Sequence, residues 1–211
     1  MSHPVILEMK GIVKSFGPVK ALKGVDLDLR AGEVHALMGE NGAGKSTLMK
    51  VLTGIHDANE GTIHYNGKQV AYSKPKEAME DGIVIVHQEL NMMNHLTVAQ
   101  NIFIGREEFR HNWLIDDGAS IKKAKKLFDL LKLDINPTEK VGNLTVGKQQ
   151  MVEIAKALSM DAKVIVFDEP TAALTESEIN ELFVIIDDLR AKGVGIIYIS
   201  HRMDEIARIT D

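Results

Sequence analysis

The sequence predicts an α/β fold in which a mainly parallel sheet is covered by helices on both faces. Four short, mostly apolar runs are candidates for buried strands, at 34–38, 83–86, 163–167 and 195–199. A strand that is buried on both faces has such a run, because neither of its faces alternates with water. Helical patterns, at 46–53 and after Thr175, separate these runs along the chain. Strands that alternate with helices are typical of a parallel sheet.

The N-terminal part carries strand patterns of a different kind. Residues 5–9 and 25–29 are candidate strands, and the second alternates apolar with acidic residues, so one of its faces is expected to meet water. The segments 61–65 and 69–72 flank Asn66-Gly67, a pair that favours a type I′ turn. We therefore expect a β-hairpin there.

The middle of the chain, from 91 to 160, has mostly helical patterns. In its clearest helix, at 121–131, the apolar side chains on one face are Ile121, Ala124, Phe128 and Leu131. The four lysines of this helix are typical of a solvated face. A later helix is expected to begin after Thr175, which forms a capping-box pattern with Glu178.

The composition is that of an ordinary globular chain, with 211 residues, 45% hydrophobic and 26% charged. The absence of cysteine excludes disulfides and thiolate metal sites and fits a reducing compartment. A net charge of −5 argues against bulk nucleic-acid binding. We expect no signal peptide, and the apolar runs are too short to cross a bilayer. A role at a membrane would therefore require a protein partner.

The most specific chemical motif lies between the strand at 34–38 and the helix at 46–53. Residues 39–46, Gly-Glu-Asn-Gly-Ala-Gly-Lys-Ser, match G-x-x-x-x-G-K-[ST] in full. Glycines let the backbone curl so that its N–H groups face a phosphate chain, and the helix N-terminus adds partial positive charge. Lys45 is expected to reach the β- and γ-phosphates, and Ser46 to ligate Mg²⁺. The residues expected to bind nucleotide here are Gly39, Glu40, Asn41, Gly42, Ala43, Gly44, Lys45, Ser46 and Thr47.

Two adjacent carboxylates, Asp168 and Glu169, follow the apolar strand at 163–167. Asp168 is expected to hold Mg²⁺ through water, which leaves Glu169 to polarise an attacking water as a general base. Two acids at a strand end would otherwise be ordinary solvated groups. Beside a phosphate-binding loop, the catalytic interpretation is favoured.

Two further strands end in polar residues that can act on a phosphate. His201 follows the strand at 195–199 and can hydrogen-bond the γ-phosphate, although its position leaves a structural role equally open. Gln88 follows the strand at 83–86 and can coordinate Mg²⁺ or position water through its amide oxygen. Position alone does not establish the role of Gln88.

In this order, the motifs resemble those of the ATP-binding subunits of ABC transporters. The deciding segment is 144–150, Leu-Thr-Val-Gly-Lys-Gln-Gln, which is similar to the LSGGQ signature of that family. It departs from the signature where Thr145 stands for Ser, Val146 for the first Gly and Lys148 for Gln. Taken alone, the segment would be an ordinary helix start. Its occurrence together with the other motifs favours the family.

The resemblance covers essentially the whole chain and implies a P-loop NTPase fold. This fold has a RecA-like core, an N-terminal antiparallel β subdomain and an inserted helical subdomain. The core with its β subdomain is expected at 1–90 and 161–211, and the helical signature subdomain at 91–160. Together they would make a single nucleotide-binding domain, 1–211, truncated at its C-terminus.

The resemblance also implies roles for individual residues. The implied catalytic residues are Glu169, His201 and Gln88, and the implied Mg²⁺ ligands are Ser46, Gln88 and Asp168. Phe16 matches the aromatic residue that stacks on adenine, with a buried structural phenylalanine as the alternative. Thr145 and Gly147 would contact the ATP held by a second domain.

The implied reaction is the hydrolysis of ATP, bound with Mg²⁺, to ADP and phosphate. Two domains would close head to tail over the nucleotides, because both touch the γ-phosphate. The implied partners are that second nucleotide-binding domain and transmembrane permease subunits, without nucleic acid and without direct contact with sugar. The expected location is cytoplasmic, on the inner face of the cell membrane.

Within the family, the segments 149–156 and 174–178 resemble importers of ribose, galactose or xylose type. Those proteins usually carry two ATP-binding halves in one chain, and this sequence would be the first. Lys148 replaces a neutral amide of the signature, and Thr175 occupies the usual aspartate position of the D-loop. Both departures weigh against efficient hydrolysis by a self-dimer, although not against ATP binding.

Three other functions stay open at this level. A soluble ABC-type ATPase of DNA repair or translation would need long coiled coils or basic insertions, which the sequence lacks. A P-loop kinase would leave the segment 144–150 and Gln88 unexplained. A nucleotide-binding module with little hydrolysis is compatible with the truncation.

Overall fold

The structure is a computed structural model that describes residues 3–40, 42–110 and 114–210. The chain divides into two compact units. The core unit comprises Met1–His87, Ala162–Glu169 and Ile186–Asp211, and the helical unit comprises Gln88–Asp161 and Pro170–Ile185. The sequence placed residues 170–185 with the core, whereas in the structure they cluster with the helical unit. Each unit is described by itself.

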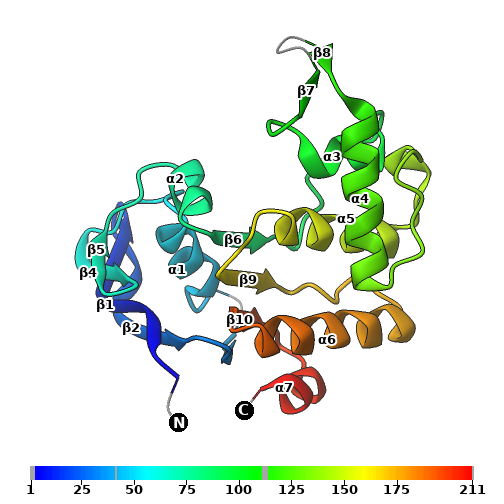
Figure 1. The fold of residues 1–211 in the computed structure, drawn as a ribbon. Helices are drawn as coiled ribbons and strands as arrows, with labels where there is room; N and C mark the ends of the chain where they lie inside the picture. The colour runs from blue at the N-terminus through cyan, green and yellow to red at the C-terminus, as the bar shows by residue number, and fades with distance from the viewer. Residues whose placement is uncertain (1–2, 41, 111–113, 211) are drawn as a thin grey trace. The chain divides into compact units, whose positions relative to one another are not determined.

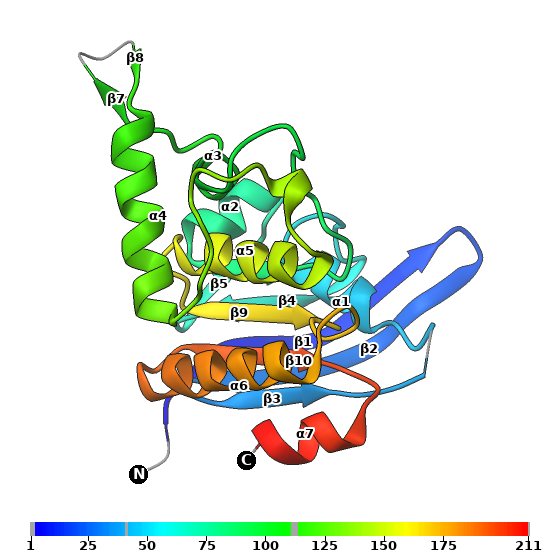
Figure 2. The ribbon, with the colours of Figure 1, turned by 90° about the vertical axis from the view of Figure 1, so that its right-hand side faces the viewer.

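The core unit contains a parallel four-stranded sheet with the strand order β3-β10-β9-β6. Its strands are β3 (Val34–Leu37), β6 (Ile83–Val86), β9 (Val164–Asp168) and β10 (Gly195–Ile199). They coincide closely with the four apolar runs of the sequence. Every residue of β10 is buried, and Figure 2 shows β9, β10 and β3 running side by side. The predicted α/β class with a mainly parallel sheet is confirmed.

A second sheet of the core unit is antiparallel, with the order β2-β1-β4-β5. Its strands are β1 (Val5–Phe16), β2 (Val19–Arg30), β4 (Glu60–Tyr65) and β5 (Lys68–Val70). β1 and β2 are longer than predicted, and they continue through a register shift between Met9 and Ile12. At this irregularity, the N–H of Gly11 donates to Asp26 Oδ1 at 2.6 Å. The hairpin turn has positive φ at Asn66 and Gly67, as a type I′ turn requires.

Three short helices lie wholly in the core unit: α1 (Lys45–Leu52), α2 (Pro75–Glu80) and α7 (Met203–Ile209). α1 follows the predicted range and buries Leu48, Met49 and Leu52 in the apolar core that both sheets share. The sequence pattern did not reveal α2 and α7, because helices of six and seven residues are too short for an apolar period to appear.

The helical unit (Figure 1) holds α3 (Val98–Phe103), α4 (Asp117–Leu131), the 3₁₀ turn η1 (Val141–Asn143) and α5 (Val146–Leu158). α6 (Glu176–Ala191) begins in this unit. A small hairpin of β7 (Phe109–Arg110) and β8 (Leu114–Ile115) stands in the region predicted as mostly helical. Among the described residues, no helix is both long and apolar enough to cross a membrane.

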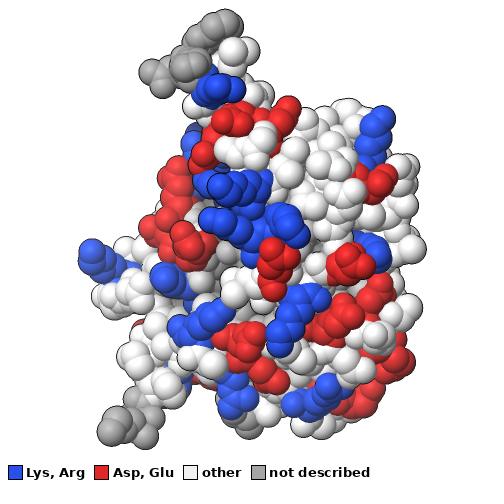
Figure 3. Space-filling model, turned by 45° about the vertical axis from the view of Figure 1, so that its right-hand side comes forward, with Lys and Arg blue, Asp and Glu red and all other residues white. Residues whose placement is uncertain are grey.

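The lysine-rich side of α4 is the solvated face that the sequence predicted. Lys123 forms an ion pair with Glu108, and Lys125 lies 3.4 Å from Asp129. On the face that Figure 3 draws, Lys and Arg side chains lie beside Asp and Glu side chains. The apolar side of the helix buries Ala124 and Phe128. The apolar stripe of α4 therefore determines which side of the helix is buried.

Candidate functional site

The predicted site residues of the core unit gather at the carboxyl edge of the parallel sheet. Leu37 at the end of β3 pairs with Ile199 at the end of β10, and Ile199 pairs with Asp168 at the end of β9. Parallel strands paired in this register deliver the segments that follow them to one edge. The glycine-rich loop, Asp168, Glu169 and His201 are thus brought together within one unit.

The loop between β3 and α1 is built so that the helix N-terminus stays open to a ligand. Gly44 adopts φ 98°, and a Cβ there would stand 2.8 Å from the carbonyl oxygen of Ala21. Only glycine fits this combination of conformation and close approach. Gly44 also supplies no side-chain cap to α1. The first N–H groups of the helix therefore point into the loop, where an anion can accept from them.

The lysine of the motif is held inside the loop by backbone carbonyls. Lys45 Nζ donates to the oxygens of Gly39, at 2.6 Å, and Glu40, at 3.2 Å. The N–H of Ala43 donates to the same Glu40 carbonyl at 3.1 Å, which closes the turn. The ammonium is thus kept at the concave side of the loop as a fixed positive charge. Of the other predicted residues, Gly39, Glu40, Gly42 and Ala43 are exposed, Thr47 is half-buried on α1, and Asn41 lies outside the described residues.

Asp168, at the end of β9, is a partly buried carboxylate beside the loop. Burial raises its pKa above the usual value, and the neighbouring charge of Glu169 raises it further. The charge of His87, the nearby hydroxyl of Ser46 and the charge of Lys45 oppose this rise. The oxygens of Ser46 and Asp168 are therefore neighbours, and both are of the kind that Mg²⁺ prefers. His87 was not singled out from the sequence, although its position directly after β6 was a usable signal.

Glu169 has an unusual backbone that aims its side chain. Its φ is 48°, a left-handed conformation that costs a residue with a side chain about 1 kcal/mol or more. Its N–H donates to the carbonyl of Ile199 at 3.0 Å, which holds the turn in place. Strain of this kind concentrates at functional sites.

His201 meets Glu169 directly. Its Nδ1 lies 3.1 Å from Glu169 Oε1. The imidazole is 68% exposed, whereas the side chain of Glu169 is 17% exposed. The sequence left a structural role for His201 open, and the two residues stand 32 positions apart along the chain. Their pairing was not predicted from the sequence.

Phe16 lies at the end of β1 with its ring 45% exposed. It makes an edge contact with the ring of His56, at 5.1 Å between centroids, and Lys14 Nζ lies 5.4 Å from its centroid. Phe16 is therefore not a buried structural residue, and its open ring is a surface on which a base can stack. Stacking on adenine stays a prediction.

In the helical unit, the segment that resembles the family signature forms the start of α5. The Thr145 hydroxyl accepts from the N–H of Lys148 at 3.3 Å and so caps the helix. Gly147 packs against the carboxylate of Glu178, so that a Cβ at position 147 would overlap with it. Thr175 donates from its N–H and its hydroxyl to Glu178 Oε2, at 2.8 and 2.9 Å, which confirms the predicted capping box.

Gln88 is the first residue of the helical unit and is exposed. Thr145 and Gly147 belong to the same unit, where Thr145 is exposed and Gly147 is buried. The proposed contacts of these three residues with nucleotide or metal stay predictions.

The protein has a P-loop NTPase fold, which is indicated by the parallel sheet, the loop after β3 and the acids after β9. A family model described as ABC transporter matches residues 22–172. The chain therefore belongs to the ABC transporter family, as its resemblance predicted.

Two curated relatives and two solved structures show how far the similarity extends. A putative ribose/galactose/methyl galactoside import ATP-binding protein 1 of Burkholderia lata is 57% identical over 209 residues, covering 99% of this chain and 41% of that protein. The ribose import ATP-binding protein RbsA of Geobacillus kaustophilus is 54% identical over 207 residues, covering 98% of this chain and 42% of that protein. The chain thus spans about two fifths of the length of these relatives.

Crystal structures of an ATP-binding cassette from an ABC transporter share the fold at 34% identity. Its ADP conformation superimposes with a TM-score of 0.86, covering 99% of this chain and 85% of that chain. The TM-score of a nucleotide-free cassette is 0.88, with 99% of this chain and 86% of that chain covered. The antiparallel sheet and the helical unit therefore belong to the fold of the family.

Proposed function

We propose that this domain binds ATP with Mg²⁺ and hydrolyses it as the ATPase part of an ABC transporter. The observation that carries the proposal is the meeting of four features at one sheet edge of the core unit. These are the open N-terminus of α1, the fixed ammonium of Lys45, the carboxylate of Asp168 and the pair of Glu169 with His201. Cation, metal ligand and base are the parts that phosphoryl transfer to water requires.

In the proposed reaction, the loop residues bind the triphosphate and the base activates water. The water oxygen forms a bond to the γ-phosphorus while the bond from that phosphorus to the β,γ-bridging oxygen breaks. Glu169 takes the proton of the water, and ADP and inorganic phosphate leave. The left-handed backbone of Glu169 and its contact with His201 orient the accepting carboxylate.

Ser46 and Asp168 fit a Mg²⁺ site, because their oxygens are neighbours at the loop. Mg²⁺ supplies charge neutralisation at the phosphate oxygens when it is bound there. Gln88 is a further proposed ligand. The exposed ring of Phe16 would stack on the adenine, with Lys14 beside it to meet the negative charge of the nucleotide.

The second half of each site would come from another nucleotide-binding domain. Thr145 and Gly147 at the start of α5 would face the γ-phosphate held by that domain, head to tail. ATP would then favour the closed pair and ADP would not, because the γ-phosphate is the group that both domains touch. The relatives' greater length supports a second half in the same polypeptide as the partner.

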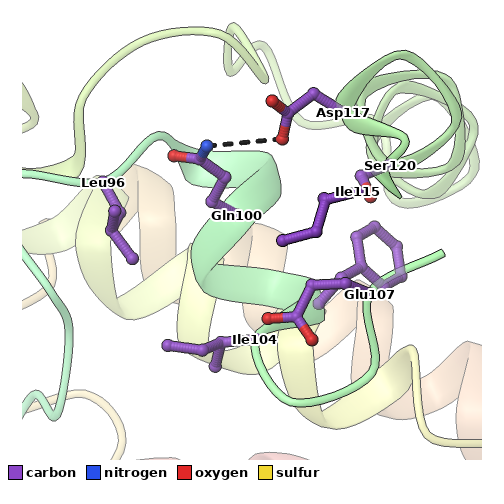
Figure 4. A pocket seen from close by; sticks show the side chains of 8 residues that line it. Leu96, Gln100, Ile104, Glu107, Ile115, Asp117 and Ser120 are labelled. Carbon is purple, nitrogen blue, oxygen red and sulfur yellow. Dashed lines mark hydrogen bonds between the residues drawn. The ribbon is translucent and has the colours of Figure 1, made fainter. Parts of the chain in front are cut away.

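The permease is the other proposed partner, and the helical unit offers a cavity for one of its helices. Figure 4 shows this cavity, of 180 Å³, with Leu96, Ile104 and Ile115 on its apolar walls. At its rim, Gln100 Nε2 donates to Asp117 at 3.3 Å. An apolar hollow with a polar rim fits the tip of an amphipathic segment. Ile104→Glu should release the permease, whereas Leu130→Glu, on the exposed side of α4, should not.

The names of the relatives support a sugar as the cargo. The proposed location is the inner face of the cell membrane, where the domain would attach to the permease. We propose that this domain contacts neither sugar nor nucleic acid directly. Co-purification of the full-length protein with a permease supports the transporter role. Co-purification with nucleic acid would instead support a soluble ABC-type ATPase.

The test of the reaction is Glu169→Gln in the full-length protein. ATP binding, measured by calorimetry with Mg²⁺, should persist, while hydrolysis should fall by about 100-fold or more because the base is lost. Glu80→Gln, at an exposed acid of α2, is the matched control and should leave both unchanged. Turnover that survives Glu169→Gln would remove this residue from the role of base. A requirement for an acceptor other than water would indicate a kinase.

A further inference from the structure

A buried carboxylate lies directly behind the proposed catalytic histidine. Glu205, on α7, is 2% exposed although it is an acid on a short helix of mixed polarity. Acids are rarely buried to this degree unless several groups satisfy their charge. The position of Glu205 therefore demands a structural or functional reason.

Among the groups that contact this carboxylate, three come from alternate residues of one segment. Glu205 Oε2 accepts from the hydroxyl of Tyr198 at 3.0 Å and from the hydroxyl of Ser200 at 3.1 Å. Its Oε1 lies 2.9 Å from Nη1 of Arg202. Tyr198 is fully buried in β10, so the network is anchored in the parallel sheet.

The network holds the backbone on both sides of His201. Ser200 precedes the histidine and Arg202 follows it, and both side chains contact the same carboxylate. The Ser200 hydroxyl also accepts from the N–H of Arg202 at 3.0 Å, which closes the turn across His201. Residues 200 and 202 turn inward to Glu205, and the 68% exposed side chain of His201 turns outward.

The outward side of this turn carries the contact of His201 with Glu169. The Nδ1–Oε1 distance of 3.1 Å depends on where the turn places the imidazole, because most of this side chain is exposed. We propose that Glu205 is a positioning residue, which fixes the turn of residues 200–202 so that His201 meets Glu169. The proposal rests on the proposed function and adds a residue to its site.

The network around Glu205 is of the kind that fixes a neighbouring side chain in addition to stabilising the fold. A fully satisfied buried network of this kind rigidifies its surroundings, and each part of it has one geometry. The loss of a group that orients a functional side chain typically costs about 10- to 100-fold in the affinity or activity that side chain supports. The effect should pass through His201 and leave the loop around Lys45 untouched.

The test uses Glu205→Gln in the full-length protein, which preserves the shape of the side chain and removes its charge. We expect kcat for ATP hydrolysis to fall about tenfold while KM for ATP stays within about twofold. In a His201→Ala background, Glu205→Gln should change kcat by less than about twofold, because the residue acts through His201. Glu80→Gln, at an exposed acid of α2 that does not contact this network, is the matched control and should have little effect.

Two further measurements test the role of Glu205 if Glu205→Gln folds poorly or if hydrolysis is absent. Tyr198→Phe removes one donor from the network and should give a smaller loss of kcat in the same direction. The imidazole signals of His201 in NMR spectra should shift or broaden in both variants, without any need for turnover. Equal losses with and without His201, or an unchanged His201 signal, would overturn the role of Glu205. Absence of hydrolysis in the wild type, with the His201 signal responding, would overturn only the proposed ATPase.

Discussion

The two helix N-termini that are expected to face phosphate are built in opposite ways. α1 of the core unit begins at Gly44, which gives no side-chain cap, and Lys45 adds a fixed cation. α5 of the helical unit begins at Thr145, whose hydroxyl already caps the helix. A carboxylate, Glu178, packs against Gly147 in its first turn.

The difference indicates that the N-terminus of α1 can bind an anion alone, whereas the N-terminus of α5 cannot. An uncapped helix end with a lysine can hold an anion without help. A capped end with an acid nearby is a poor anion site alone. Under the proposed function, it would contact phosphate only when another domain presents it. The four predictions that follow are in order of decreasing effect, and the first three test this asymmetry.

Lys45→Ala should have the largest effect. The loss of the ammonium in the loop should weaken ATP binding by about 100-fold or more, because charge-assisted contacts to phosphate disappear. Calorimetry with Mg²⁺ measures this, with Lys50→Ala at the exposed end of the same helix as the control. Equal affinities of the two variants would contradict an autonomous binding site in the core unit.

Gly147→Ala should destabilise the fold by about 1–3 kcal/mol, because the added Cβ overlaps with the carboxylate of Glu178. The free energy of unfolding in urea measures this cost. In a Glu178→Ala background the same substitution should cost much less. Gly118→Ala, in the first turn of α4, is the control and should cost much less, because the nearest atom to its Cβ would be Asp116 Oδ1 at 3.3 Å. Additive effects at positions 147 and 178 would show that the contact does not constrain the glycine.

Thr145→Ala should cost about 1 kcal/mol of stability through loss of the cap. ATP binding by the core unit should not change, because the N-terminus of α5 takes no part in it. The control is Thr97→Ala, which removes the cap of α3 in the same unit. A large fall in ATP affinity for Thr145→Ala alone would mean that α5 already contributes to the first binding step.

Among the changes in stability, that of Asp168→Asn should be the smallest, and it should be visible as a change in pH dependence. The folded protein raises the pKa of Asp168, so between the usual pKa and the raised pKa the folded state holds a proton that the unfolded state has lost. Stability therefore falls as the pH rises through this range. The variant has no carboxylate at this position and does not lose stability in this way. Its melting temperature should exceed that of the wild type near neutral pH and approach it in acid. Solvent screening of this half-exposed group keeps the gain small.

Much of this architecture could be predicted because it depends on local patterns. The apolar runs located β6 and β10 within the ranges observed, and the Asn66-Gly67 pair located the hairpin turn. The capping box at Thr175 was also visible in the sequence. The short helices α2 and α7 escaped prediction, because six or seven residues cannot establish a helical period.

The residue types of the site could be identified without a structure, because the loop motif and the acids after β9 are each contiguous along the chain. Their geometry follows from the folding of the chain. The tertiary structure gave Glu169 its left-handed backbone, paired it with His201 and placed Glu205 behind that histidine. These contacts depend on the parallel register of β9 and β10, which brings together residues that are far apart in the sequence. A periodic pattern records which face of an element is buried, but it does not record which elements become neighbours.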